Sequence, residues 1–188
     1  MLWISRLIKR GSSPLLAVLL VLVASASGTQ SAAEQQAQQA QLGPVSKLPL
    51  PRFVSLKSDR VNLHEGPSKE HPTRWVYQRA GLPVEITAEF ENWRRVRDWD
   101  GDEGWVYHSL LSGRRTVLVA PTVKNKRELL PLFERPDQRG AIVARLEPRV
   151  MGSVKRCTGT WCRISGKGFD GWIQQGRLWG VYPNEQID

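Results

Sequence analysis

Three stretches decide the fold of this chain: Val61-Asn62-Leu63-His64-Glu65-Gly66-Pro67, then Trp93-Arg94-Arg95-Val96, then Gly104-Trp105-Val106. Trp93 follows Pro67 by 26 residues, and Trp105 follows Trp93 by 12. The second half repeats this layout, because Arg135-Pro136 is followed by Trp161-Cys162-Arg163-Ile164 at 25 residues from the proline and by Gly171-Trp172-Ile173 eleven later. Self-similarity at a fixed period indicates two copies of one supersecondary unit.

Short strands separated by turns are expected throughout both copies. Val84-Glu85-Ile86-Thr87 alternates apolar and polar residues, which is typical of a half-buried strand. Further strands are expected in the second copy near residues 131–133, 150–155, 162–165 and 172–174. About five short strands in roughly sixty residues are too few for two full sheets, but they can close into a small barrel with one apolar core. The sequence therefore predicts an all-β fold of two tandem small barrels.

The first 26 residues have the pattern of a secretory signal peptide. Arg6, Lys9 and Arg10 precede an apolar run of eleven residues, 14–24, and Ala24-Ser25-Ala26 supplies small residues for cleavage after Ala26. Eleven residues are too few to cross a bilayer, which takes about 20, so no membrane span is expected after cleavage. A retained N-terminal anchor is the alternative. The protein is expected to be periplasmic or secreted.

Residues 27–51 are predicted to be a flexible linker. The stretch 30–41 is almost entirely Gln, Ala, Ser and Glu, which offers too few apolar side chains to offset the entropy of ordering. Pro44, Pro49 and Pro51 are expected to extend the chain up to the first domain. The predicted organisation continues with domain 1 at 52–118, a basic linker at 119–128, a divergent domain 2 at 129–183 and a tail at 184–188.

The charge of the chain bears on its partners. The net charge of +9 includes three cations of the predicted signal peptide, which has no acidic residue, so the exported part carries +6. An exported protein seldom meets nucleic acid, so nucleic acid is not expected as a partner, whereas anionic components of the envelope are. A basic surface that only aids solubility is the alternative.

The two cysteines, Cys157 and Cys162, both lie in the second copy. If residues 158–161 form the end of a hairpin, the two side chains face each other across the strands, close to disulfide geometry. The oxidising compartment favours the bond. A metal site or a reactive thiol is the alternative, but no histidine lies nearby in sequence to complete one.

The three stretches quoted first resemble the bacterial SH3-like domain. That family's usual pattern is an Asn-apolar-Arg-Ser-Gly-Pro turn, a Gly before the second strand, a Trp-x-x-Val strand and Gly-Trp-Val; Gly81 fits the expected glycine. The similarity covers residues 52 to about 118 and, more weakly, 129–182. His64 and Glu65 replace the usual Arg and Ser. In the second copy Arg135 replaces the turn glycine, and Arg149 stands where the first copy has Gly81.

The resemblance implies non-catalytic recognition in the cell envelope. The expected ligand is cell-wall peptidoglycan or its stem peptides, with aromatic side chains providing contact area and arginines pairing with carboxylates. The alternative is a protein-interaction module in which the barrels hold an extended segment of a periplasmic partner against a groove or a sheet edge. A third hypothesis is a thiol-active or hydrolytic enzyme.

Aromatic residues are the first candidates for ligand contact. The chain has eight tryptophans, and those at repeated positions, 93, 105, 161 and 172, are interpreted as packing residues. The ligand-binding candidates are Trp75, Tyr77, Trp99, Tyr107 and Trp179. The candidates for attracting anions at the joint between the copies are Arg114, Arg115, Lys124, Lys126 and Arg127, with a solvated surface as the alternative.

Catalytic and metal motifs have little support in the sequence. The acidic turn 98–104 begins like a calcium-binding EF-hand loop, but positions six and twelve are Glu103 and Ser109 instead of Gly and Glu. A solvated hairpin tip is therefore expected there. His108 beside Ser109 is not a triad, and no phosphate-binding glycine loop or zinc-binding His pair occurs. No catalytic residue, metal or cofactor is expected.

Overall fold

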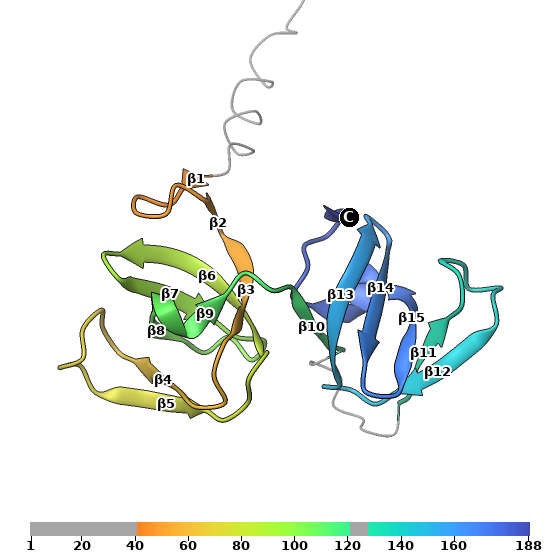
Figure 1. Cartoon of the computed structure of the whole chain (residues 1–188), viewed down its shortest axis with the longest axis horizontal. Coiled ribbons are helices and arrows are strands. Elements are labelled where there is room, and N and C mark those ends of the chain that lie inside the picture. The colour runs from red at the N-terminus through yellow and green to blue at the C-terminus, as the bar shows by residue number, and fades with distance from the viewer. Residues whose placement is uncertain (1–40, 121–127) are drawn as a thin grey trace, which may run out of the picture. The chain divides into compact units, whose positions relative to one another are not determined.

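The computed structural model describes residues 41–120 and 128–188, which belong to one compact unit. Their fold is all-β and contains two large antiparallel sheets (Figure 1). The first sheet contains β3 (Arg52–Leu56), β4 (Val61–His64), β5 (Thr73–Tyr77), β6 (Pro83–Phe90), β7 (Trp93–Arg97), β8 (Glu103–Tyr107) and β9 (Leu111–Ser112), with the 3₁₀ turn η1 (His108–Leu110) before β9. The second contains β10 (Thr116–Val119), β11 (Leu130–Phe133), β12 (Ile142–Leu146), β13 (Met151–Thr158), β14 (Trp161–Gly166), β15 (Phe169–Gln174), β16 (Leu178–Trp179) and β17 (Gln186–Ile187), with η2 (Gln175–Arg177) before β16. A separate pair joins β1 (Gln41–Leu42) and β2 (Pro49–Leu50).

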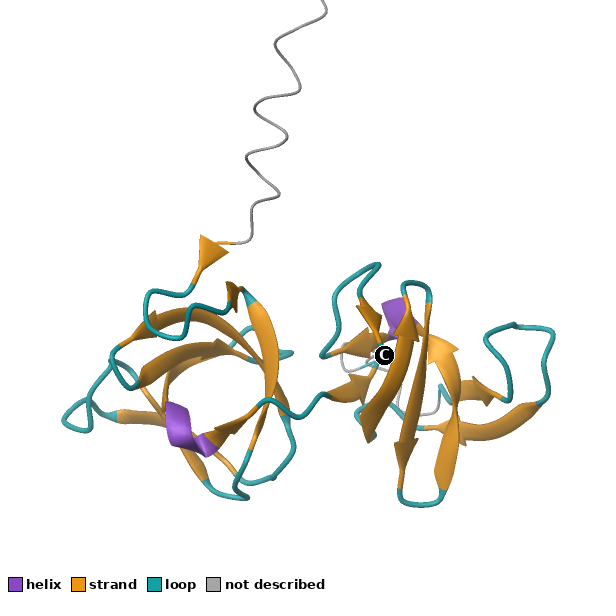
Figure 2. Cartoon of the chain, turned by 45° about the horizontal axis from the view of Figure 1, so that its top comes forward, coloured by secondary structure: helices purple, strands orange, loops and turns teal. Residues whose placement is uncertain are grey.

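The two large sheets repeat one strand order. The first runs β5-β4-β8-β7-β6-β3-β9, and the second runs β12-β11-β15-β14-β13-β10-β16, with β17 added on β13. Position by position the second order reproduces the first, and each 3₁₀ turn directly precedes the strand that ends this order, β9 or β16 (Figure 2). The predicted all-β fold and the tandem repeat are confirmed.

Each repeat has its own apolar core, which follows from the alternation along its strands. In β4, Val61 and Leu63 are buried while Asn62 between them is exposed. Leu130 and Leu132 hold the equivalent buried places in β11. Side chains of period 2 point to one face of a strand, so each repeat closes its strands around one interior.

Strand β10 corrects the expected domain boundary. It pairs with β13 and β16 of the second sheet, so the boundary predicted after Leu118 falls inside a strand, and the sheets divide between β9 and β10. The run Thr116-Val117-Leu118-Val119 is a strand-forming sequence that could extend either repeat, and only its pairing settles the choice. Most of the predicted basic linker, residues 121–127, lies outside the described residues.

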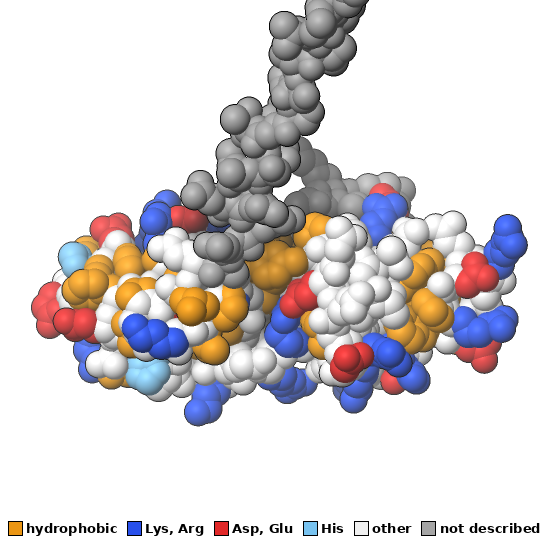
Figure 3. All heavy atoms as spheres, turned by 90° about the horizontal axis from the view of Figure 1, so that it is seen from above, with side chains coloured by type: hydrophobic (Ala, Val, Ile, Leu, Met, Phe, Trp, Pro, Cys, Tyr) orange, Lys and Arg blue, Asp and Glu red, His pale blue; other side chains and the backbone are white. Residues whose placement is uncertain are grey.

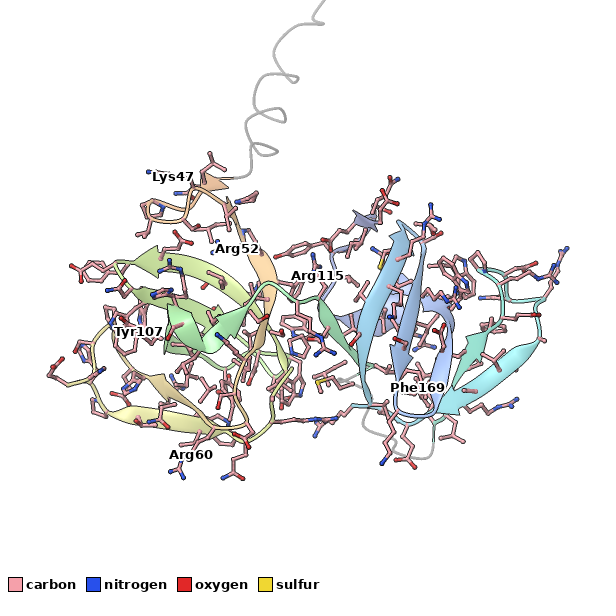
Figure 4. The ribbon with its side chains drawn as sticks, viewed as in Figure 1. Lys47, Arg52, Arg60, Tyr107, Arg115 and Phe169 are labelled. Atoms are coloured by element: carbon pink, nitrogen blue, oxygen red, sulfur yellow. A yellow bond between two sulfur atoms is a disulfide. The ribbon has the colours of Figure 1, made fainter. Side chains whose placement is uncertain are left out.

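Residues 41–50, expected to be part of a flexible linker, form a short hairpin against the first barrel. Glu89 holds it: its carboxylate accepts hydrogen bonds from the Val45 N–H (3.1 Å), the Ser46 N–H (2.8 Å) and the Ser46 hydroxyl (2.6 Å). Arg52 and Arg94 pair with the same carboxylate at 2.8 and 3.3 Å. Figure 4 shows Arg52 on β3 close to this hairpin. Because Glu89 lies about forty residues further along the chain, local composition could not reveal this docking.

The second repeat covers one side of β6, which was expected to be half-buried. Glu85 is only 3% exposed, and its carboxylate accepts hydrogen bonds from the Arg97 Nε at 3.0 Å and from the Tyr182 hydroxyl at 2.9 Å. Phe53 of β3 packs edge-on against Trp179, with ring centroids 5.0 Å apart. Glu85 of β6 is therefore bonded by a residue that follows it by almost a hundred positions.

The C-terminal part of the second sheet is closed by a disulfide and by the tail. Cys157 and Cys162 are cross-strand partners in β13 and β14 and form the predicted disulfide. The predicted tail at 184–188 instead contributes β17, which pairs with β13. The predicted signal peptide lies outside the described residues. Within residues 41–120 and 128–188 no helix is long and apolar enough to cross a membrane.

Candidate functional site

A groove with a volume of about 680 Å³ lies beside β5. We call it the aromatic groove and define it by Arg74, Trp75, Tyr77, Trp99, Leu118 and Arg149. Three of the five aromatic residues proposed from the sequence thus line one cavity. The second repeat contributes Leu118 and Arg149, so the groove is complete only when both repeats are present.

Strand β5 supplies one wall of the groove. It is the last strand of its sheet and pairs only with β4 among the described strands. Trp75 is 54% exposed, whereas Tyr77, two residues on and on the same face, is buried. The strand therefore offers an exposed indole beside a free edge of backbone donors and acceptors.

A buried hydrogen-bond network fixes the floor. The Tyr77 hydroxyl donates to Asp98 Oδ2 at 3.1 Å, and Asp98 Oδ1 accepts the N–H groups of Asp100 and Asp102, each at 3.0 Å. Burial, and then the nearby Asp98 carboxylate, raises the pKa of Tyr77 above its ordinary value. Burial also raises the pKa of Asp98, although the hydrogen bonds that it accepts partly oppose this change. The phenol is thus a permanently neutral donor that orients the turn.

Trp99 follows Asp98 directly and packs against the first core. Its indole nitrogen is buried and has no hydrogen-bond partner among the described residues. A buried donor without an acceptor is costly, so such a group calls for an explanation. The acidic turn 98–104 is consequently not a plain solvated hairpin tip, because Asp98 is buried and Trp99 lines the groove.

Arg149 occupies its place in a strained backbone conformation. Its φ of 67° lies in the left-handed region, as does the φ of 78° at Gly81, the equivalent position in the first repeat. The backbone bonds are also equivalent: Gly81 N–H donates to the Leu56 carbonyl at 2.8 Å, and Arg149 N–H donates to the Val119 carbonyl at 2.7 Å. A non-glycine residue is disfavoured in this region, and such strain is concentrated at functional sites.

The other two aromatic candidates lie elsewhere. Trp179 packs on Phe53 and donates its indole N–H to the Pro83 carbonyl at 3.3 Å, so it belongs to the joint between the repeats. Tyr107 lines a separate pocket on the first repeat together with Arg60 and Trp93. The structure therefore does not bring these two to the aromatic groove.

Two of the basic candidates at the joint, Arg114 and Arg115, lie among the described residues. Arg115 is engaged by Glu185, with Nη–Oε distances of 2.7 and 2.9 Å, and by the Gly180 carbonyl. Arg114 is exposed and donates to the Ser153 hydroxyl at 2.7 Å. Lys124, Lys126 and Arg127 lie outside the described residues. On the face drawn in Figure 3, the Lys and Arg side chains are spread among acidic and apolar ones.

Sequence reasoning missed the groove's arginines and Leu118. Arg74 and Arg79 flank the aromatic residues of β5, and that strand was not predicted, although Thr73-Arg74-Trp75-Val76-Tyr77 is rich in strand formers. For Arg149 the sequence does carry a signal, because an arginine stands where the first repeat has Gly81.

Comparison with known proteins gives the following matches. Residues 57–113 and 126–180 each match the profile of the bacterial SH3 domain. Matching solved structures include NlpC1 from Trichomonas vaginalis, 14% identical over 73% of this chain and 48% of that chain with a TM-score of 0.32. NlpC2 from Trichomonas vaginalis is 12% identical over 69% of this chain and 48% of that chain, also with a TM-score of 0.32. This chain therefore spans about half the length of those two proteins. No curated protein matches it.

Proposed function

Because the chain belongs to the bacterial SH3 domain family, we propose that it is a non-catalytic binding protein of the cell envelope that recognises peptidoglycan through the stem peptides. Bacterial SH3 domains often bind the cell wall. The family and the disulfide both point to a location outside the cytoplasm. The observation that carries the proposal is the aromatic groove, in which Trp75 and Trp99 meet the arginines of both repeats.

The groove has the chemistry that a wall peptide needs. Stem peptides are short and extended and bear carboxylates, which Arg74, Arg79 and Arg149 can pair with. The exposed Trp75 indole offers contact area at a low cost in side-chain entropy. Trp99 adds a second indole to the lining of the groove, beside the exposed Trp75.

Catalysis has no support in the residues that the structure describes. Both cysteines are in the disulfide, which leaves no thiolate for a Cys–His mechanism. His64 Nδ1 lies 2.9 Å from the His71 carbonyl oxygen, so this imidazole is engaged with backbone and not with a nucleophile. We therefore propose binding without turnover.

Cosedimentation with purified peptidoglycan sacculi at low and moderate salt tests the proposal. The wild-type protein is expected to sediment with sacculi at both salt concentrations, because stacking and hydrogen bonds persist where screened charges do not. Trp75→Ala is expected to weaken binding roughly tenfold through the loss of aromatic contact. Phe90→Ala is the matched control, because Phe90 is an aromatic residue with 50% exposure that does not line the groove.

Arg149→Gly separates the binding role of this residue from a structural one. Glycine accepts the left-handed backbone, so the stability is expected to stay within about 1 kcal/mol of wild type. Binding to sacculi is expected to fall because a cation leaves the groove. Unchanged binding in both Trp75→Ala and Arg149→Gly would exclude the groove as the wall-binding site.

A periplasmic protein partner is the second candidate, and the free edge of β5 favours it. An extended segment could add to this edge and place alternate side chains in the groove. This reading predicts no sedimentation with sacculi at either salt concentration, and a specific polypeptide crosslinked through a photoreactive residue at position 75.

A further inference from the structure

A second pocket lies on the first repeat, apart from the aromatic groove. We call it the Tyr107 pocket and define it by Arg60, Asn62, His64, Lys69, Trp93 and Tyr107; its volume is about 480 Å³. None of these residues lines the aromatic groove. Its wall is a row of rings packed edge to face, with centroids 5.3 Å apart for His64–Trp93 and 5.5 Å apart for Trp93–Tyr107.

The second repeat has a pocket at the equivalent place. We call it the Phe133 pocket and define it by Leu129, Pro131, Phe133, Gln138, Gln174 and Arg177; its volume is about 320 Å³. In the repeated strand order β11 is equivalent to β4, and β15 is equivalent to β8. His64 pairs with Trp105 and Phe133 pairs with Trp172, so Phe133 is the counterpart of His64, and Gln174 is the counterpart of Tyr107. Phe133 also packs edge-on against Trp161 at 5.6 Å, as His64 does against Trp93. The duplication has therefore preserved a pocket and not only a fold.

The two pockets differ in the charge of their rims. The first has Arg60 and Lys69, both exposed, and neither makes an ion pair with another described residue. At the corresponding positions the second has Leu129 and Gln138, both neutral. Its one cation, Arg177, lies 3.9 Å from Glu128.

We infer that the Tyr107 pocket is a second binding site, which takes an anionic group, a carboxylate or a phosphate, between Arg60 and Lys69 and against the aromatic wall. The two cations supply charge-assisted hydrogen bonds, the Asn62 amide supplies a further donor, and the rings exclude water from one side. Figure 4 shows Arg60 and Tyr107 both on the first repeat, away from the second sheet. The Phe133 pocket has neither of these two cations, and its Arg177 lies beside Glu128, so it does not bind the same group.

Amide chemical shifts of the ¹⁵N-labelled protein test this inference, with three probes: N-acetyl-alanyl-alanine, its C-terminal amide, and glycerol 3-phosphate. Saturable shifts are expected at Asn62, His64 and Tyr107 with the free carboxylate or the phosphate, and not with the amide. Comparison of the shifts caused by N-acetyl-alanyl-alanine with those caused by glycerol 3-phosphate shows whether the pocket takes a carboxylate or a phosphate. Equal shifts with the amide, or no saturable shift with either anion, would overturn the inference.

Matched charge variants separate a site from general electrostatics. Arg60→Gln combined with Lys69→Gln is expected to weaken binding of the anion about tenfold or more. Arg139→Gln combined with Lys167→Gln removes the same two charges from exposed positions outside both pockets and is expected to leave it unchanged. Equal weakening in both pairs would show that only the net charge matters.

The repeat also permits a transplant. Leu129→Arg with Gln138→Lys places the two cations on the rim of the Phe133 pocket, at positions that are already exposed. New shifts at Phe133 and Gln174 on addition of the same anion are the expected result. Absence of such shifts in a folded variant would contradict the equivalence of the two pockets.

Discussion

Asp98 stabilises the turn that carries Trp99, because its carboxylate accepts the Tyr77 hydroxyl and two backbone N–H groups. Asp98→Ala leaves these donors without acceptors and is expected to lower the free energy of unfolding by about 2 kcal/mol. It is also expected to weaken binding in the aromatic groove, because the turn behind Trp99 is released. Chemical denaturation and sacculus binding measure the two effects.

Asp98→Asn is the matched control, since an amide oxygen still accepts the two backbone N–H groups. Burial raises the pKa of Asp98, so folding favours its protonated form. The pH-dependent part of the stability that comes from ionisation of Asp98 is therefore greatest below the unfolded pKa and is lost as the pH rises through the folded pKa, while the hydrogen bonds that Asp98 accepts remain. Asp98→Asn should remove that pH dependence, and a variant with the wild-type profile would contradict this assignment.

At the scale of single residues, the sequence suggested Trp75, Tyr77 and Trp99 as candidates because aromatic residues outside the repeated positions are conspicuous. It did not predict that Glu85 and Arg94 are buried, since each depends on partners distant in the chain. Arg149 is recognisable in the sequence as a substitution for glycine, but its position in a groove beside β5 follows only from the packing of the second repeat against the first.

The hairpin of β1 and β2 depends on Glu89, whose behaviour with pH is opposite to that of Asp98. Burial alone would raise the pKa of Glu89, but hydrogen bonds from Ser46, Arg52 and Val45 outweigh it and lower the pKa to about 2. The stabilisation is therefore present above the ordinary value of 4.5 and is lost as the pH falls towards 2.

Glu89→Gln is expected to lower the free energy of unfolding at neutral pH by about 3 kcal/mol, because Arg52 and Arg94 lose their buried partner. It should also abolish the loss of stability between pH 4.5 and 2. Amide shifts of Val45 and Ser46 report whether the hairpin stays docked. A hairpin that is equally ordered in the variant would show that Glu89 does not hold it.

The disulfide acts within one hairpin, β13–β14, and closes a short loop. Replacing both cysteines by serine is expected to lower the free energy of unfolding by about 2 kcal/mol in the chain-entropy model. Binding in the aromatic groove should be unchanged, since neither cysteine lines it. Thermal unfolding with and without reductant provides the same comparison for the wild-type protein.

At the scale of elements, alternation placed β6 in the first repeat, and the strands expected in the second repeat coincide with β11, β13, β14 and β15. The sequence did not predict β3, β5, β10 and β12, because these strands lack the Trp and Gly-Trp signatures and are defined by their pairing. The hairpin at 41–50 was missed for a different reason: its stability resides in Glu89 and Arg52, outside the segment.

Contacts between the repeats make their unfolding interdependent. The Thr116 hydroxyl donates to the Gly81 carbonyl at 2.6 Å, and Leu118 of β10 is part of the first core. Calorimetry is expected to show one transition for the wild-type protein. Trp179→Ala removes the ring that packs on Phe53 and is expected to cost about 3 kcal/mol and to split the transition in two.

Tyr182→Phe is the milder comparison, because it removes only the hydrogen bond to Glu85 and keeps the ring against Phe53. A loss of about 1 kcal/mol with a single transition is expected. Two transitions in the wild-type protein would show that the repeats fold independently. The tandem repeat could be predicted from sequence, whereas this interdependence could not, because its residues are spread over both copies.

Strand β10 pairs in the second sheet while its Leu118 side chain fills the first core. No single cut of the polypeptide can therefore yield two self-sufficient modules. Cleavage after Ser112 would remove Leu118 from the first barrel. Cleavage within residues 121–127 would separate β10 from its partner strands and leave it as an unpaired, aggregation-prone edge. Transfer of this binding unit to another protein has to carry both barrels as one inseparable cassette.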